Sequence, residues 1–252
     1  MKTIGAFVLF SLLTTGPLTN QTKKISLTEK FKSTQLIVVT SAAEAATVGT
    51  LSLYNYSASS KTWMRVIGPI PVNLGRTGFA WGAGLHESSL TSGTLKHEGD
   101  GKSPAGIYYL RTAFGYAPAS AFVNKTYPYQ QMTPSSFCVD DANSSYYNKL
   151  VDEQKIEGAK DWKSDEVMKR NDDLYKWGVN IGYNDEAVTK GGGSCIFFHI
   201  WRRPNSPTAG CTSMSEENLL KLLKEIRSEA TPLVVQGTQA QYGAMKNLYE
   251  LP

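Results

Sequence analysis

Short apolar runs rich in Val, Ile, Thr and Tyr, separated by Gly, Pro, Ser and Asn, occupy the first half of the chain. QLIVVTS (35–41) is rich in β-branched residues, TLSLYNYS (50–57) alternates apolar and polar positions, and KTWMRVIGPIPVNLG (61–75) continues this pattern. Such runs are typical of strands. Because no long segment with a helical period precedes about residue 148, the pattern predicts a β-rich first half.

The run CIFFHIW (195–201) predicts a buried strand in the second half. Side chains alternate between the two faces of a strand. One face would carry Cys195, Phe197, His199 and Trp201, and the other Ile196, Phe198 and Ile200. Since both faces are largely apolar, we expect this strand to be central in its sheet.

Helical patterns are confined to the later part of the chain. SEENLLKLLKEIRSE (215–229) has Ser215 as a natural N-cap and Glu216 and Glu217 in the first turn, where they complement the helix dipole. Its predicted inward stripe consists of Leu219, Leu222, Leu223 and Ile226. Residues 162–176 are a second helical candidate, and TPLVVQ (231–236) predicts one more strand.

The N-terminus resembles a secretory signal. Lys2 precedes the apolar run IGAFVLFSLL (4–13), and polar residues follow. The run is too short to span a bilayer as a stable helix; the alternative is an N-terminal helix or strand of a cytosolic protein. We therefore expect a signal peptide over residues 1–20, a flexible segment over 21–34, and one domain over 35–252 with no membrane span once the signal is removed.

Composition and charge exclude several classes of protein. With 41% hydrophobic and 19% charged residues, the chain of 252 residues is typical of a globular protein. Its formal net charge is only +4, and no basic stripe is interleaved with aromatic residues, so we expect no nucleic-acid partner. One histidine with scattered cysteines lacks the paired spacing of a zinc site, so we expect no metal and no other cofactor.

FFHIWRRPNSPTAGCTSM (197–214) is the stretch with candidate chemistry. A cysteine nucleophile needs a histidine in contact and an unobstructed position. The turn-rich connection between His199 and Cys211 could bring the two within hydrogen-bond reach. Gly210 would permit a close approach of substrate, and the amides of Cys211, Thr212 and Ser213 could hold an oxyanion. The alternative is a buried thiol near a satisfied core histidine.

This stretch resembles the catalytic domain of the L,D-transpeptidase (YkuD-like) family, with TAGC (208–211) in place of the family's SHGC. EGDGKSPAGIYYL (98–110) is similar to the family's K-[ST]-P-x-G-x-[FY] loop and strand. The run LIVVT, the NLGRTG turn (73–78) and the two YN pairs (147–148 and 183–184) also fit a divergent branch. The similarity covers roughly residues 35–236.

The resemblance implies a mainly β (α+β) fold, a β-sandwich with flanking helices, in an exported enzyme of the periplasm or cell envelope. Its partners would be peptidoglycan stem peptides; nothing in the sequence indicates an oligomeric state. Cys211 would form a thioacyl-enzyme, His199 would act as base and then acid, and the Ile200 carbonyl would orient the imidazole. A second amine would give a 3→3 crosslink, and water would give L,D-carboxypeptidase trimming.

Two departures from the family affect substrate preference. Ala209 replaces the histidine before Gly-Cys, and Ser213 stands where many relatives have Arg or Asn. Arg202 and Arg203 are candidate substitutes for carboxylate binding, or else solvated loop charges. Trp201 and His97 are further candidates for substrate contacts.

If Cys211 must stay reduced, Cys138 and Cys195 remain as a possible disulfide pair. Two other functions stay open. One is a cysteine hydrolase of another envelope amide, and the other is a non-catalytic peptidoglycan-binding module on the same fold.

Overall fold

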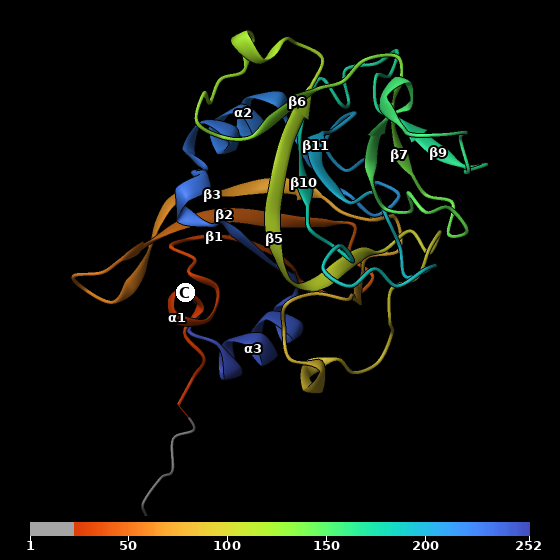
Figure 1. Ribbon diagram of the computed structural model, residues 1–252. Coiled ribbons are helices and arrows are strands. Elements are labelled where there is room, and N and C mark those ends of the chain that lie inside the picture. The colour runs from red at the N-terminus through yellow and green to blue at the C-terminus, as the bar shows by residue number, and fades with distance from the viewer. Residues whose placement is uncertain (1–22) are drawn as a thin grey trace, which may run out of the picture.

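A computed structural model describes residues 23–252, which form a mainly β structure with few helices (Figure 1). The helices are α1 (Leu27–Phe31), α2 (Glu216–Glu225) and α3 (Gln239–Leu248), with short 3-10 turns η1 (Ser88–Leu90), η2 (Ala119–Ala121), η3 (Glu153–Lys155) and η4 (Ser228–Ala230). The strands are β1 (Gln35–Ser41), β2 (Val48–Ser57), β3 (Thr62–Asn73), β4 (Phe79–Trp81), β5 (Ser103–Gly115), β6 (Tyr129–Gln131), β7 (Ser136–Val139), β8 (Leu150–Asp152), β9 (Asp165–Val167), β10 (Trp177–Ile181), β11 (Phe197–Ile200), β12 (Thr212–Met214) and β13 (Leu233–Thr238).

The main sheet folds back on itself through the long strand β5. Its strands follow the order β10-β11-β12-β3-β2-β1-β13-β5-β4, and β10 also pairs with β5. The first half of β5 pairs with β4 and β13, and its second half pairs with β10 and β6. This arrangement gives the β-sandwich with flanking helices that the family resemblance implies.

Helices cover the sandwich where the sequence has an amphipathic pattern. Ser215 caps α2 by accepting a hydrogen bond from the Asn218 amide, and the predicted stripe of this helix is fully buried. Helix α2 packs on β10 and β11, and α3 packs on β13 and β1. The predicted helix over 215–229 and the predicted strands over 35–41, 195–201 and 231–236 are therefore confirmed, with small differences at their ends.

Two expectations about local structure are wrong. Within the predicted loose segment 21–34, residues 27–31 form α1. This helix is held to the domain because its Leu27, which is 1% exposed, packs into the core. Residues 162–176 contain the short strand β9 and turns instead of a helix. Asp172 there accepts a hydrogen bond from the Leu174 amide, the kind of local bond by which Asp favours turns over helix. The predicted signal peptide lies outside the described residues.

A small second sheet lies beside the main one. Strands β8, β7 and β9 form it, and Figure 1 shows it next to β10 and β11. A disulfide joins Cys138 in β7 to Cys195, two residues before the start of β11, across a sequence separation of 57. The predicted Cys138–Cys195 pair is therefore confirmed, and it fastens the small sheet to the strand that carries His199.

Candidate active site

Two neighbouring strands position His199 and Cys211. Strands β11 and β12 run parallel, with His199 opposite Ser213. Cys211 directly precedes β12, and it lines the same cavity as His199 and Ser213. The two candidates therefore come from adjacent strand segments beside one cavity.

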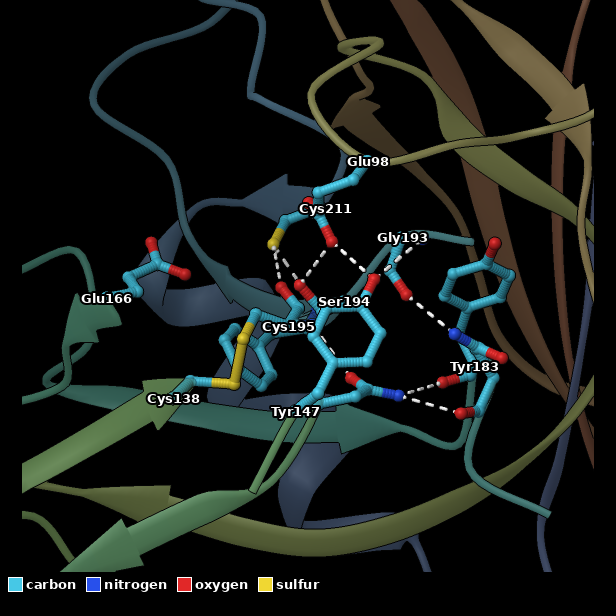
Figure 2. Close-up of a disulfide and its surroundings, with 12 residues drawn as sticks. Glu98, Cys138, Tyr147, Glu166, Tyr183, Gly193, Ser194, Cys195 and Cys211 are labelled. Carbon is cyan, nitrogen blue, oxygen red and sulfur yellow. Dashed lines mark hydrogen bonds between the residues drawn. A yellow bond between two sulfur atoms is a disulfide. The ribbon is translucent and has the colours of Figure 1, made fainter. Parts of the chain in front are cut away.

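The Cys211 sulfur is held by backbone groups of the preceding segment. Its Sγ accepts a hydrogen bond from the Phe197 amide at 3.3 Å and donates one to the Cys195 carbonyl at 3.4 Å (Figure 2). Cys195 has a φ of 57°, in the left-handed region. Burial raises the pKa of the Cys211 thiol well above its usual value, and the nearby Glu166 carboxyl raises it further. The resting sulfur is therefore a protonated thiol.

His199 is oriented by the carbonyl that the sequence analysis expects. Its Nδ1 lies 2.7 Å from the Ile200 carbonyl oxygen. Because a carbonyl can only accept, Nδ1 carries the proton and Nε2 keeps a free lone pair. Burial lowers the pKa of His199 to about 4, so the imidazole is neutral at pH 7. This is the protonation state that a general base requires.

Cys211 and His199 line the same cavity. Each residue is 7% exposed, and both line a cavity of about 560 Å³. No hydrogen bond joins their side chains in residues 23–252, so the expected hydrogen bond between the thiol and the imidazole is absent from this state. Catalytic hydrogen bonds are often long before substrate binds. Both residues can therefore reach a molecule that binds in this cavity.

The two motifs that carry the family resemblance pack against each other. Ser103 accepts from the Gly75 amide at 2.9 Å and donates to the Cys211 carbonyl at 3.4 Å. Thr208 donates to the same carbonyl at 2.5 Å. A Cβ at Gly210 would lie 3.0 Å from the Lys102 carbonyl oxygen, so glycine permits the close approach of the loops.

The predicted oxyanion residues contribute unequally. The Gly210 amide already donates to Thr208 Oγ1 at 3.1 Å, so its part in the site is the space that it leaves open. Thr212 and Ser213 belong to β12, which pairs with β11 and with β3. Their amides as oxyanion donors stay a prediction. The Ser213 hydroxyl is buried without a partner in the described residues and belongs to the cavity lining.

The predicted substrate contacts divide into one inside the cavity and three outside it. Arg202 lines the cavity, whereas Arg203, Trp201 and His97 do not. Arg203 is exposed, and its carbonyl accepts from Asn73 on β3. Trp201 follows the end of β11, so the alternation does not extend to it. His97 is exposed and turns its ring toward the Glu98 carbonyl.

A family model for the YkuD L,D-transpeptidase catalytic domain matches residues 55–235, more than half of the chain. The chain belongs to this family. Members of the family act on peptidoglycan and are generally enzymes of the cell envelope. Searches of curated proteins and of solved structures found no match. Within residues 23–252, no helix is long and apolar enough to cross a membrane, and no cluster of His, Cys, Asp and Glu could hold a metal ion.

This YkuD domain has an aromatic residue beside the candidate base that the sequence analysis missed. The Tyr175 ring packs edge-on against the His199 ring at 5.2 Å, and its hydroxyl donates to Glu166 Oε1. The hydroxyl also lowers the pKa of Cys211, and burial raises the pKa of Glu166. Tyr175 lies 24 residues before His199, and no local pattern marks it.

The two YN pairs brace the segment that leads to Cys195. Asn148 donates to the carbonyls of Tyr183 and Asn184 at 2.8 and 2.9 Å and accepts from the Cys195 amide at 3.0 Å. Tyr147 donates to Glu98 Oε2 at 2.6 Å and accepts from the Gly193 amide at 3.0 Å. Figure 2 shows Tyr147 near Cys195 and Tyr183 farther to the right of the disulfide. The two pairs fix the carbonyl on which the Cys211 thiol rests.

The rest of the cavity lining bears charges of both signs. Acidic side chains come from β9, from the residue after β7 and from the loop before β5, and that loop also supplies the basic Lys96. The charged residues of the lining are Arg76, Lys96, Glu98, Asp140, Asp165, Glu166, Arg170 and Arg202.

Proposed function

We propose that this YkuD domain acts on peptidoglycan stem peptides through a Cys211 thioacyl-enzyme. The observation that carries the proposal is the shared cavity: Cys211 and a correctly oriented, neutral His199 line it together. Family membership supplies the class of substrate. No cofactor takes part in this reaction.

Both reacting groups are neutral at rest, so the thiolate forms during attack. His199 Nε2 takes the thiol proton while Cys211 Sγ bonds to the carbonyl carbon of the scissile amide. When the tetrahedral intermediate collapses, the C–N bond breaks and the imidazolium gives its proton to the leaving amine. A second stem amine then attacks the thioester to form a crosslink, or water attacks it to give trimming. The thiol is regenerated in either case.

The mixed charges of the cavity support a peptide substrate with both carboxylates and amines. Arg202 and Arg170 can bind carboxylates, and Arg170 is itself held by Asp172 through two bonds of 2.9 Å. Asp140 Oδ1 requires a donor instead, because it is buried without a hydrogen-bond partner in the described part of the chain. An ammonium group of the substrate would satisfy it.

We propose that the protein works outside the cytoplasm, in the periplasm or cell envelope, after removal of a signal over residues 1–20. The Cys138–Cys195 disulfide supports export, because such bonds form and persist mainly in oxidising compartments.

Defined tetrapeptide and pentapeptide muropeptides, analysed by mass spectrometry after incubation with the protein, test the function. Crosslinked dimers indicate transfer, and shortened stems indicate hydrolysis. We expect Cys211→Ala to abolish either product while its circular dichroism stays that of the wild type. An active alanine variant, or a wild type without either product, would reject the proposal.

A further inference from the structure

Lys96 is a buried lysine in the wall of the cavity. Its side chain is 4% exposed, and its Nζ lies 2.8 Å from Oδ1 of Asp100, which is 5% exposed. Lysine is rarely buried to this degree unless it is paired. The pair explains the burial but does not explain why the ammonium belongs to the lining of the cavity.

The ammonium is held in place from several directions. Asp100 also accepts from the amides of His97 and Lys102, at 2.9 and 2.8 Å, which fixes the carboxylate. The Lys96 ammonium lies 5.9 Å from the centroid of the Tyr183 ring. A charge fixed before reaction costs no reorganisation when new charge develops next to it.

The ammonium also has donors to spare. It carries three N–H bonds, and Asp100 is its single hydrogen-bond acceptor in residues 23–252. It lies beside the backbone that leads into Cys211, because a Cβ built at Gly210 would be 3.7 Å from Nζ. The remaining donors can therefore serve a group bound next to the sulfur.

Groups around the sulfur shift the pKa of Cys211 in opposite directions. Burial and Glu166 raise the pKa of the Cys211 thiol, while the Phe197 amide, Lys96 and the Tyr175 hydroxyl lower it. Of these groups, Lys96 is the one cationic side chain, and it forms an ion pair with Asp100.

We propose that Lys96 is a catalytic residue whose ammonium stabilises the negative charge that develops on Cys211 and on the substrate carbonyl oxygen during attack. The part that concerns the carbonyl oxygen rests on the proposed function, whereas the part that concerns the sulfur does not. By analogy with the loss of one oxyanion donor, removal of this charge should lower kcat about 100-fold or more.

The test separates this role from that of a structural ion pair. Lys96→Met alone leaves Asp100 buried without its partner, so the main variant is Lys96→Met with Asp100→Asn, which removes both charges together. Lys96→Arg keeps the positive charge. Lys102→Met is the matched control, because Lys102 belongs to the same loop but donates to the Thr77 carbonyl at 2.8 Å and does not line the cavity.

The first measurement is the pH dependence of Cys211 alkylation by iodoacetamide, with the disulfide intact. We expect the alkylation rate of the double variant between pH 7 and 9 to fall about 10-fold or more, because a smaller fraction of the thiol ionises there, while Lys102→Met and Lys96→Arg stay near the wild type. The second measurement is turnover of muropeptides, in which we expect kcat of the double variant to fall about 100-fold with little change in KM.

A folded double variant with wild-type alkylation and wild-type kcat would overturn the inference and leave the proposed function standing. A shifted alkylation profile in a protein whose wild type does not turn over muropeptides would reject the proposed function and support the role of Lys96 at the sulfur.

Discussion

The Cys211 thiol donates to the Cys195 carbonyl at 3.4 Å, so the free cysteine rests on the residue that forms the disulfide with Cys138. The position of the candidate nucleophile therefore depends on how the small sheet is fastened. That sheet also supplies Glu166 to the cavity. The disulfide therefore helps to hold both the nucleophile and part of the cavity wall in place.

Removal of the disulfide should destabilise the protein. The Cys138→Ala, Cys195→Ala double variant removes a crosslink between residues 57 apart in sequence. The greater entropy of the unfolded chain should then lower the free energy of unfolding by about 4 kcal/mol. Urea unfolding monitored by fluorescence measures this loss. Cys211→Ala is the control, because it leaves the bond intact and should cost less. Equal midpoints for the double variant and the wild type would contradict the prediction.

The sequence predicts those parts of the fold that local patterns encode. The strand CIFFHIW and the helix after Ser215 follow from alternation and from capping, which need only neighbours in sequence. The motifs at 98–110 and 208–211 carry the family resemblance in the sequence, and the structure adds that they meet through the hydrogen bond from Ser103 to the Cys211 carbonyl. The hydrogen bond from His199 to the Ile200 carbonyl is likewise local.

The rest of the site depends on contacts between distant segments. The apolar residues that suggest a helix over 162–176 serve different environments: Trp162 and Met168 belong to separate clusters, and Val167 is 45% exposed. Glu166 lies in β9 and Tyr175 lies two residues before β10, and both line the cavity only because segments distant from Cys211 in sequence pack around it. Such contacts between distant segments leave no local pattern in the sequence.

Tyr175→Phe should make Cys211 less reactive. The variant loses the hydroxyl that lowers the pKa of Cys211 and leaves the buried Glu166 carboxyl without its donor. We expect slower alkylation by iodoacetamide at pH 7 and a stability loss of about 1–3 kcal/mol. Tyr116→Phe is the control, because its hydroxyl donates to the Asp172 carbonyl at 2.9 Å, away from the sulfur. If Tyr175→Phe reacted as fast as Tyr116→Phe, the hydroxyl would have no role at the thiol.

Asn148→Ala should weaken the support of Cys195. Three hydrogen bonds from one side chain are lost, at about 1 kcal/mol each. Asn148 has a φ of 64°, so alanine adds a backbone cost that Asn148→Gly avoids. Urea unfolding of both variants separates the two effects. Asn143→Ala, which loses one exposed side-chain hydrogen bond to Asp141, is the surface control and should change stability little. A glycine variant as stable as the wild type would show that the three bonds contribute nothing net.

Stability should fall as the pH drops from 7 to 5. Burial lowers the pKa of His86 and of His199 to about 4, against 6.5 for a free histidine. Between these values the unfolded chain binds more protons than the native one, so acid favours unfolding. The stabilisation is complete above pH 6.5, is lost as the pH falls toward 4, and amounts to about 2 kcal/mol per histidine between pH 7 and 5.

His86→Gln isolates one of these two contributions. The His86 Nδ1 accepts from the Ile107 amide at 3.3 Å, and a glutamine oxygen can accept in its place without titrating near pH 6. We expect this variant to lose about half of the difference in unfolding free energy between pH 7 and pH 5, measured by urea titration at each pH. His97→Gln is the matched control, because His97 is exposed and the variant should keep the full difference. If all three proteins showed the same pH dependence, the buried histidines would not be its source.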